Sequence, residues 1–173
     1  MDAWQAINSV RVVRQFEERP LAAEHLDRIL NAGRRTGSSK NEQRWAFIVI
    51  QEREHLWELA GVGRYADHLA GAAAAVALVV PAASDPLRAL SVMWDLGRAA
   101  QNMVLAAWEL RIGSAPATVF DQDLVRQLLG LPDEQRCDFI LSFGYPADPS
   151  VLTRPNRPGG RKPLEAVVHS ERW

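Results

Sequence analysis

Hydrogen-bonding side chains gather in the loop between Thr36 and Trp45. Four of them fall within six positions and carry hydroxyl or amide groups: Ser38, Ser39, Asn41 and Gln43. The loop follows an apolar stripe of helical spacing and precedes the apolar run from Ala46 to Ile50, which is typical of a strand. Such a loop can present several donors and acceptors at one point, and the same residues also suit an ordinary helix-to-strand turn.

Two arginines lie three positions apart near the start of the chain. Arg11 and Arg14 enclose Val12 and Val13. Each guanidinium offers a planar fork of donors with a fixed charge, which suits a phosphate group. The alternative is a pair of solvated arginines near a helix end.

A second basic segment lies near the end of the chain. Pro149 to Pro163 contains four prolines, two glycines, four basic residues and no acidic residue. This composition argues against a packed helix or a central strand and is compatible with a disordered tail. The strand-like run from Leu164 to His169 and the terminal Trp173 favour instead an arm that is held against a protein surface.

Small residues dominate the segment from Ile112 to Phe120, which we interpret as a loop. The lack of bulk would let a flat ring approach backbone N–H and C=O groups. An ordinary turn between two helices is the alternative for this segment.

The remaining residues argue against several other kinds of site. The sequence shows no Ser-His-Asp, Cys-His or paired-carboxylate arrangement, so a cofactor should carry any reaction. The four histidines have no ligand spacing, which gives a metal site little support. The lone Cys137 excludes an intramolecular disulfide and is expected to be a core thiol. A net charge of −1 gives no general attraction to nucleic acid or anionic membranes.

The first residues and the longest apolar run bear on location. Met1 to Gln5 has no signal-peptide character, and the run from Leu69 to Val80 is too short and too rich in alanine to span a bilayer. We therefore expect a cytoplasmic protein.

Length and hydrophobic periodicity indicate a single domain over residues 1–173. We expect helices at 3–9, 21–35, 53–60, 84–111 and 122–129, and strands at 46–50, 75–80 and 138–146. The helix over 84–111 is apolar on more than one face, so it should be central to the core or shared with a second subunit. Gly61, Gly63 and Ala66 fit a G-x-G-x-x-A pattern, but a helical pattern precedes them, which argues against a dinucleotide fingerprint.

These motifs, in this order, resemble the FMN-dependent nitroreductase family over most of the chain. The resemblance rests on four sequence patterns: Ser38-Ser39-x-Asn41-x-Gln43-x-Trp45, the Arg14-x-Phe16 ending of the N-terminal motif, Asp95-x-Gly97-x-x-x-Gln101-Asn102, and the Arg161-Lys162-Pro-Leu-Glu ending. It implies an α+β fold of the nitroreductase type, a three-layer α-β-α sandwich with a mixed central sheet. It also implies a long central dimer helix and an extended C-terminal arm, residues 147–173, exchanged onto the partner subunit.

The resemblance further implies a homodimer with FMN bound at the subunit interface. The residues implied as cofactor contacts are Arg11, Val12, Val13, Arg14, Ser38, Ser39, Asn41, Gln43, Pro116, Ala117, Thr118, Val119, Arg161 and Lys162. The arginines of the N-terminal motif and the basic residues of the arm would serve the phosphate. The segment from Pro116 to Val119 would lie against the reactive edge of the flavin, with a backbone N–H donating to ring N5. No side chain is implied as an acid or a base.

The implied activity is that of a ping-pong oxidoreductase. NAD(P)H gives a hydride to flavin N5 and leaves, and an electron-poor acceptor, a nitroaromatic or a quinone, is then reduced in the same place. Two alternatives stay open. One is a flavin-dependent dehydrogenase or dehalogenase of the same fold, or a member reduced by a deazaflavin. The other is a flavin-binding protein without pyridine-nucleotide turnover.

Two departures from the family pattern bear on the site. Val10-Arg11-Val12 stands where the family usually has Arg-Arg-Ser, so the basic residues of the arm are expected to supply the missing charge. Arg44 stands where the family usually has proline. We expect Arg44 either to favour an anionic acceptor or the phosphates of NAD(P)H, or to be a solvated surface arginine. The chain is also shorter than many members, which suggests a reduced lid and an open site.

Overall fold

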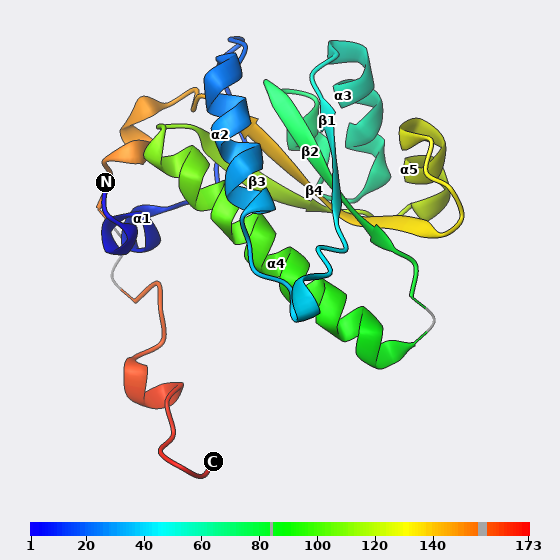
Figure 1. The fold of residues 1–173 in the computed structure, drawn as a ribbon. Coiled ribbons are helices and arrows are strands. Elements are labelled where there is room, and N and C mark those ends of the chain that lie inside the picture. The colour runs from blue at the N-terminus through cyan, green and yellow to red at the C-terminus, as the bar shows by residue number, and fades with distance from the viewer. Residues whose placement is uncertain (84, 156–158) are drawn as a thin grey trace.

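The computed structural model describes residues 1–83, 85–155 and 159–173, and a four-stranded antiparallel sheet forms its centre (Figure 1). The strands are β1 (Ala46–Ile50), β2 (Ala74–Pro81), β3 (Gly113–Thr118) and β4 (Gln135–Gly144). Their spatial order is β1-β2-β4-β3, so β1 and β3 are the edges of the sheet. The resemblance implied a mixed sheet, but the four strands pair only in antiparallel fashion. The described residues add one parallel bridge outside the strands, between Val12 and Ser114 at the outer edge of β3.

Strand β2 is apolar at almost every position because both of its faces are covered. Successive side chains of a strand point to opposite faces, and the side chains of β2 alternate between two hydrophobic cores. Those of the first core are Ala75, Ala77 and Val79, and those of the second are Ala74, Val76, Leu78 and Val80. The packing on both faces holds the sheet in place, and the candidate site lies at one of its two edges.

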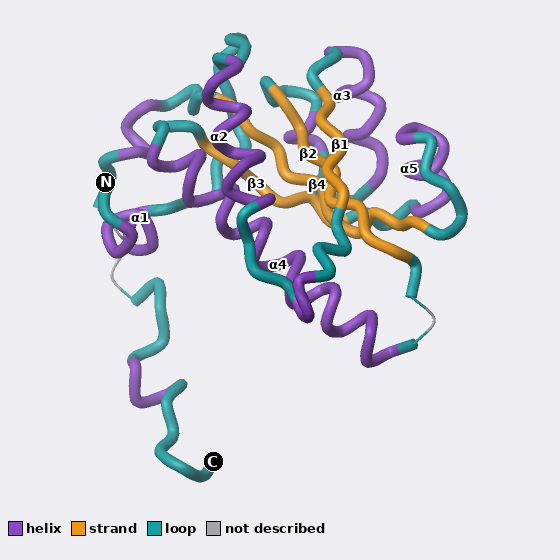
Figure 2. The backbone as a smooth tube through the Cα atoms, in the orientation of Figure 1, coloured by secondary structure: helices purple, strands orange, loops and turns teal. Residues whose placement is uncertain are grey.

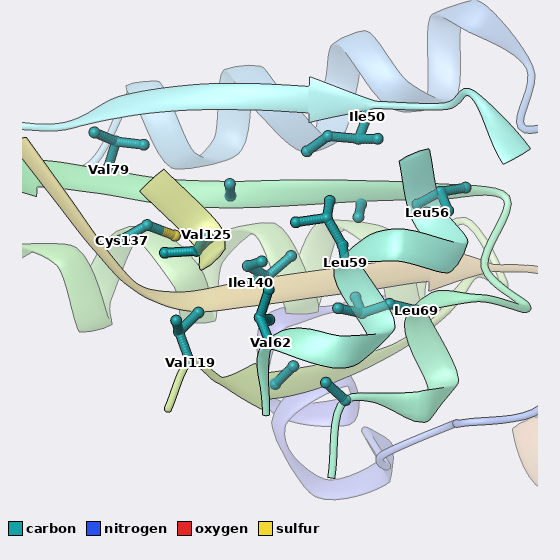
Figure 3. Packing of buried hydrophobic residues seen from close by; sticks show 14 of the residues in the cluster. Ile50, Leu56, Leu59, Val62, Leu69, Val79, Val119, Val125, Cys137 and Ile140 are labelled. Carbon is teal, nitrogen blue, oxygen red and sulfur yellow. The ribbon is translucent and has the colours of Figure 1, made fainter. Parts of the chain in front are cut away.

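The helices form the two outer layers (Figures 1 and 2). They are α1 (Ala3–Ser9), α2 (Ala23–Arg34), α3 (Arg53–Leu59), α4 (Pro86–Glu109) and α5 (Gln122–Leu129). Helices α3 and α5 cover the first core, and α2 and α4 cover the second. Figure 3 shows the first core, in which Leu59 of α3 and Val125 of α5 pack with Ile140 of β4. The α+β architecture of three layers is thus the one that the resemblance implied.

Most predicted helices and strands are present with similar bounds. Helix α4 begins after Asp85, whose carboxylate accepts a hydrogen bond from the Leu87 N–H, and Pro86 occupies its first turn. Ser84, which the prediction included in this helix, lies outside the described residues. With 24 residues the helix is about 36 Å long.

Two predictions are wrong. The segment from Ile112 to Phe120 is not a loop, because Gly113–Thr118 pairs with β4 as an edge strand. Its small residues serve close packing at the edge. The run from Leu164 to His169 is not a strand either. It contains the short 3₁₀ turn Leu164–Ala166, and the backbone N–H groups that follow bond locally to preceding carbonyls.

The end of the C-terminal arm, residues 159–173, runs away from the body of the molecule, whereas the start of the arm lies on the body, where the Ala147 N–H donates to the Gln15 carbonyl at 3.0 Å (Figure 1). Its apolar side chains are exposed, and Trp173 is fully so. Of the arm, residues 156–158 lie outside the described part of the chain. None of the helices in the described residues is both long and apolar enough to cross a membrane.

Candidate functional site

The N-terminal segment lies along the outer edge of β3. The Val13 N–H donates to the Ser114 carbonyl at 2.9 Å. Val13 is buried against Gly113, where an added Cβ would lie 2.5 Å from the Val13 Cβ. Glycine at position 113 therefore allows the two segments to meet, and their contact fixes the position of Arg11 and Arg14 on either side of Val13.

The side chains of this segment differ in what they contact. Arg11 is partly buried and donates to the backbone carbonyl of Arg154. Val12 and Arg14 are exposed. Of the two arginines, Arg14 is therefore the more open to a ligand.

The backbone of β3 offers hydrogen-bonding groups at the same edge. In an antiparallel pair the N–H and C=O groups of successive residues point to opposite sides of the strand. The Ser114 carbonyl points outward, so the backbone groups of Pro116 and Thr118 point outward too. Proline is tolerated at 116 because the N–H that it lacks would face away from β4. The side chains of Ala117 and Val119 are buried, so this stretch contributes mainly its backbone.

A buried histidine stands beside this edge. His68 lies in the 3₁₀ turn Asp67–Leu69 and is only 7% exposed. Its Nδ1 lies 2.8 Å from the Ser142 Oγ, and that hydroxyl donates to the Ala115 carbonyl at 3.2 Å. The other ring nitrogen, Nε2, is buried and has no hydrogen-bond partner among the described residues. Buried polar atoms are seldom left unpaired, so this atom indicates an unfilled interaction.

The charges around His68 connect it to two parts of the predicted site. Burial lowers the pKa of His68, and the positive charge of Arg14 lowers it further. The Pro116 backbone and the carboxylate of Asp67 act in the opposite direction, and the pKa stays below its ordinary value of 6.5. Arg14 and Pro116, predicted from separate motifs, therefore lie close to one buried imidazole.

The loop of hydroxyls and amides lies on α4 rather than on β3 (Figure 2). The Ser39 N–H donates to the Asp95 Oδ2 at 2.8 Å, and the Ser91 Oγ donates to the Ser39 Oγ at 3.1 Å. Asp95 is buried and forms an ion pair with Arg98 at 3.8 Å. Farther along α4, the Asn102 side chain donates to the Thr36 hydroxyl at 2.7 Å. Polar residues of α4 therefore fix the first half of this loop.

Within the loop, the backbone adopts an unusual conformation. Lys40, Asn41 and Gln43 have φ angles of 53°, 58° and 50°, in the left-handed region that non-glycine residues rarely adopt. The Gln43 N–H donates to the Ser38 Oγ at 2.9 Å, and the Gln43 amide donates to the Asn41 Oδ1 at 3.2 Å. Backbone conformations of this kind cluster at ligand sites, where surrounding contacts enforce them. The side chains of Asn41 and Gln43 are exposed at the surface.

The remaining predicted residues are Arg44 and the two basic residues of the arm. Arg44 forms an ion pair with Glu42, so its charge is compensated by a neighbour in the loop. Arg161 donates to the adjacent Gly160 carbonyl at 3.1 Å, and Lys162 is exposed. Because the arm runs away from the body, this chain does not bring Arg161 and Lys162 to its own β3 edge.

Two hollows adjoin the end of β3. The larger, about 640 Å³, is lined by Gly61–Arg64 and Phe120–Asp123. Its Gly63 packs so closely on β3 that an added Cβ would lie 2.2 Å from the Thr118 carbonyl oxygen. The smaller, about 310 Å³, lies between α4 and the sheet. Its lining includes Val92, Met93, Thr118, Val119 and Phe139.

The β3 edge fits a flat cofactor that carries a phosphate. It combines an exposed guanidinium at Arg14 with outward backbone groups at Thr118. Sequence reasoning missed His68, because four unspaced histidines give no sign of which one is buried beside a sheet edge. It also missed how Asp95 holds the loop, although it used Asp95 as a family marker. The distance in sequence between Ser39 and Asp95 does not show that the two residues are in contact.

Comparisons with known proteins show which family the chain is similar to. The family model described as "Nitroreductase family" matches residues 7–82 and 62–145. The Archaeoglobus fulgidus protein named "Putative NADH dehydrogenase/NAD(P)H nitroreductase" is 33% identical over 144 residues, which cover 80% of this chain and 82% of that protein. A protein of the same name from Methanothermobacter thermautotrophicus is 29% identical over 178 residues, covering 100% and 88%.

Solved structures show the same fold. Nitroreductase A from Vibrio parahaemolyticus superposes with a TM-score of 0.88 at 25% identity, covering 100% of this chain and 77% of that one. An FMN-dependent nitroreductase from Clostridium difficile R20291 gives a TM-score of 0.83 at 22% identity, covering 97% and 98%.

Proposed function

The chain belongs to the nitroreductase family, and we propose that it is an FMN-dependent oxidoreductase that moves a hydride from NAD(P)H to a nitroaromatic or a quinone. The observation that carries the proposal is the outer edge of β3. There an exposed guanidinium at Arg14 and an outward Thr118 N–H lie along the same edge of a strand of small residues. A flavin nucleotide needs such a set, with a cation for its phosphate and backbone donors for its ring.

Bound FMN would supply the hydride chemistry, and the chain supplies binding and orientation. We assign the phosphate to Arg11 and Arg14, with Arg161 and Lys162 of the arm as further cations. The segment Pro116–Val119 takes the reactive edge of the ring, with the Thr118 N–H as the donor to N5. The side chains assigned to further polar contacts are Ser38, Ser39, Asn41 and Gln43. No residue of this set needs to act as an acid or a base.

A second copy of the chain is part of the proposal, because α4 has two apolar stripes. One stripe is buried in the second core: Val92, Leu96, Met103 and Ala107. The other is exposed at helical spacing, with Leu87, Leu90 and Trp94 each about 70% exposed or more. Exposed apolar stripes of this kind mark interaction surfaces. We assign this stripe to the dimer interface.

The arm supports the same assembly. Its exposed apolar residues, Leu164, Val167, Val168 and Trp173, follow directly after Arg161 and Lys162. Laid on a second chain, the arm would cover these side chains and carry two cations toward the partner's β3 edge. Such an exchange is symmetric, so each dimer would contain two equal sites. We propose a cytoplasmic location on the sequence grounds given above.

The reaction is tested with FMN-loaded protein under anaerobic conditions. NADH or NADPH should bleach the visible flavin bands, and a quinone or nitroaromatic should then restore them. Steady-state rates at several acceptor concentrations should give parallel lines in double-reciprocal plots. Flavin bands that stay oxidised with both nucleotides would overturn the assignment of the reductant and favour the dehydrogenase, dehalogenase or binding-protein alternatives.

Sharing of the site between subunits is tested by mixing two inactive variants. Arg14→Glu and Lys162→Glu should each lose FMN binding. In a random mixture, half of the dimers are mixed and each has one intact site, so about a quarter of the sites recover. Unmixed variants incubated alone are the controls. No recovery in a mixture that exchanges subunits would show that the arm does not serve the partner's site.

A further inference from the structure

His68 is the one titratable group at the β3 edge that the proposed binding set leaves without a role. It is buried, and three elements surround it: the N-terminal segment with Arg14, β3 with Pro116, and β4 with Ser142. Asp67 adds a negative charge from its own 3₁₀ turn. A buried imidazole with an unsatisfied nitrogen lowers the stability of the folded chain, so we asked what role His68 could have at this edge.

The hydrogen bonds of Ser142 indicate which nitrogen of His68 carries the proton. The Ser142 hydroxyl has one hydrogen, and it donates to the Ala115 carbonyl. It must then accept from His68, which places the proton on Nδ1. In the neutral ring, Nε2 is therefore unprotonated, and the Pro116 carbonyl beside the ring can accept a hydrogen bond once the imidazole is charged. A proton added to His68 would go to Nε2, the nitrogen that lacks a partner.

The balance of charges keeps His68 neutral in the chain alone. Burial and the positive charge of Arg14 disfavour the imidazolium, and they outweigh the Pro116 backbone and Asp67. A new negative charge beside the ring would oppose both effects, because opposite charges at close range favour the charged form. Reduction of a bound flavin by a hydride creates such a charge. Pro116, next to His68, lies two residues from Thr118, about 7 Å along the strand.

We propose that His68 takes up one proton from water when FMN bound at the β3 edge is reduced, and releases it when the flavin is reoxidised. The hydride from NAD(P)H carries two electrons and one proton to the flavin, and the second proton of the cycle is held on the His68 Nε2. On reoxidation the hydride goes to the acceptor, and the proton on Nε2 returns to solvent or to the reduced acceptor. This inference rests on the proposed function.

The test is the midpoint potential of the bound flavin as a function of pH. One additional proton per two electrons changes the equilibrium constant by a further tenfold per pH unit, which for a two-electron couple is about 30 mV per pH unit. Wild-type protein should show this steeper slope over a pH window that disappears in His68→Gln. His55→Gln is the matched control, because the His55 Nε2 is also buried without a partner but lies on α3.

A second measurement does not depend on the variant folding. In protein labelled at its histidine rings, NMR titration should show the pKa of His68 rising on reduction of the flavin, while His55 and His169 do not change. Equal slopes in wild type and His68→Gln, with FMN retained by both, or an unchanged His68 titration, would overturn this inference and leave the proposed function standing. A wild-type protein that retains no FMN would overturn both.

Discussion

The outer edge of β3 is fixed by contacts within one chain, whereas the C-terminal arm is not. At the edge, the Val13 N–H bonds to Ser114, Gly113 admits the N-terminal segment, and His68 is buried in a chain of hydrogen bonds. At the end of the arm, residues 159–173, Leu164 and Trp173 are exposed and the hydrogen bonds are local. The two regions are proposed to serve one cofactor. We propose that a single chain forms half of the site and that the arm of a second copy completes it.

The loop on α4 is held within one chain, as the β3 edge is, but it also lies beside an exposed apolar surface, as the arm does. Asp95 and Asn102 hold it firmly, but they hold it on the face of α4, which also carries the exposed stripe with Trp94. A rigid loop next to an apolar surface is well placed to present side chains to a partner subunit. Preorganised contacts of this kind reduce the entropy lost on binding.

Removal of the arm should have the largest effect. A chain lacking residues 159–173 should keep its far-ultraviolet circular dichroism, since the core contains none of these residues. It should form a weaker dimer and bind FMN at least about 100-fold more weakly, because two charge-assisted phosphate contacts are worth about 1.5–3 kcal/mol each. Sedimentation and flavin titration measure the two losses. A truncated chain that binds FMN as tightly as the full chain would make the arm irrelevant to the site.

A methyl group at position 113 should damage the other half of the site. Gly113→Ala places a Cβ 2.5 Å from that of Val13, so the N-terminal segment must shift. Overpacking of this kind costs about 1–3 kcal/mol of unfolding free energy. Gly71→Ala is the matched control, because an added Cβ there meets nothing within 4 Å. Urea unfolding distinguishes them, and equal stability of the two variants would show that the contact with β3 is adaptable.

The buried imidazole predicts a specific dependence of stability on pH. Because the pKa of His68 is lowered in the folded chain, the unfolded chain binds more protons below about pH 6.5, the ordinary value. Its contribution to stability is present above that pH and is lost as the pH falls toward the folded pKa, by at most about 1.4 kcal/mol per pH unit. Urea unfolding between about pH 7.5 and pH 5.5 should show a shallower decline in His68→Gln. Parallel declines would mean that His68 is protonated in the folded chain.

Arg44 should have the smallest effect. Since Glu42 compensates its charge, Arg44→Ala should change the Michaelis constants for NAD(P)H and the acceptor by less than about twofold. Glu42→Gln, which frees the charge of Arg44, is the informative companion and should lower the Michaelis constant of an anionic acceptor. A tenfold or larger rise (order of magnitude) in Arg44→Ala would restore Arg44 as a substrate contact.

Sequence patterns predicted those helices and strands well whose formation depends mainly on neighbouring residues in the chain. The alternation of β2 between two cores and the capped start of α4 follow from side-chain period and cap chemistry, which are properties of short segments. The segment 112–120 was predicted as a loop because small residues and a proline usually mark turns. Here pairing with β4 overrides that preference, and Pro116 fits because its missing N–H faces outward.

The candidate site was predictable only in part. The arginines of the N-terminal motif and the small residues of β3 stood out by type and spacing, and the charge of Arg14 and the backbone of Pro116 both act on the pKa of His68. His68 itself could not be predicted, because its burial arises from the packing of three elements distant in sequence. The strand expected at 164–169 failed for the same reason, since strand formation requires a neighbour.

The most direct test of the central claim is the visible absorption spectrum of the purified protein after incubation with FMN and desalting. A flavin site at the β3 edge of each chain, completed by the partner, predicts retained flavin bands at one FMN per chain in a dimer. The same spectrum of Arg14→Glu should show no bands. Wild-type protein that loses all flavin on desalting, or an Arg14→Glu variant that keeps it, would contradict the assignment of the cofactor to this edge.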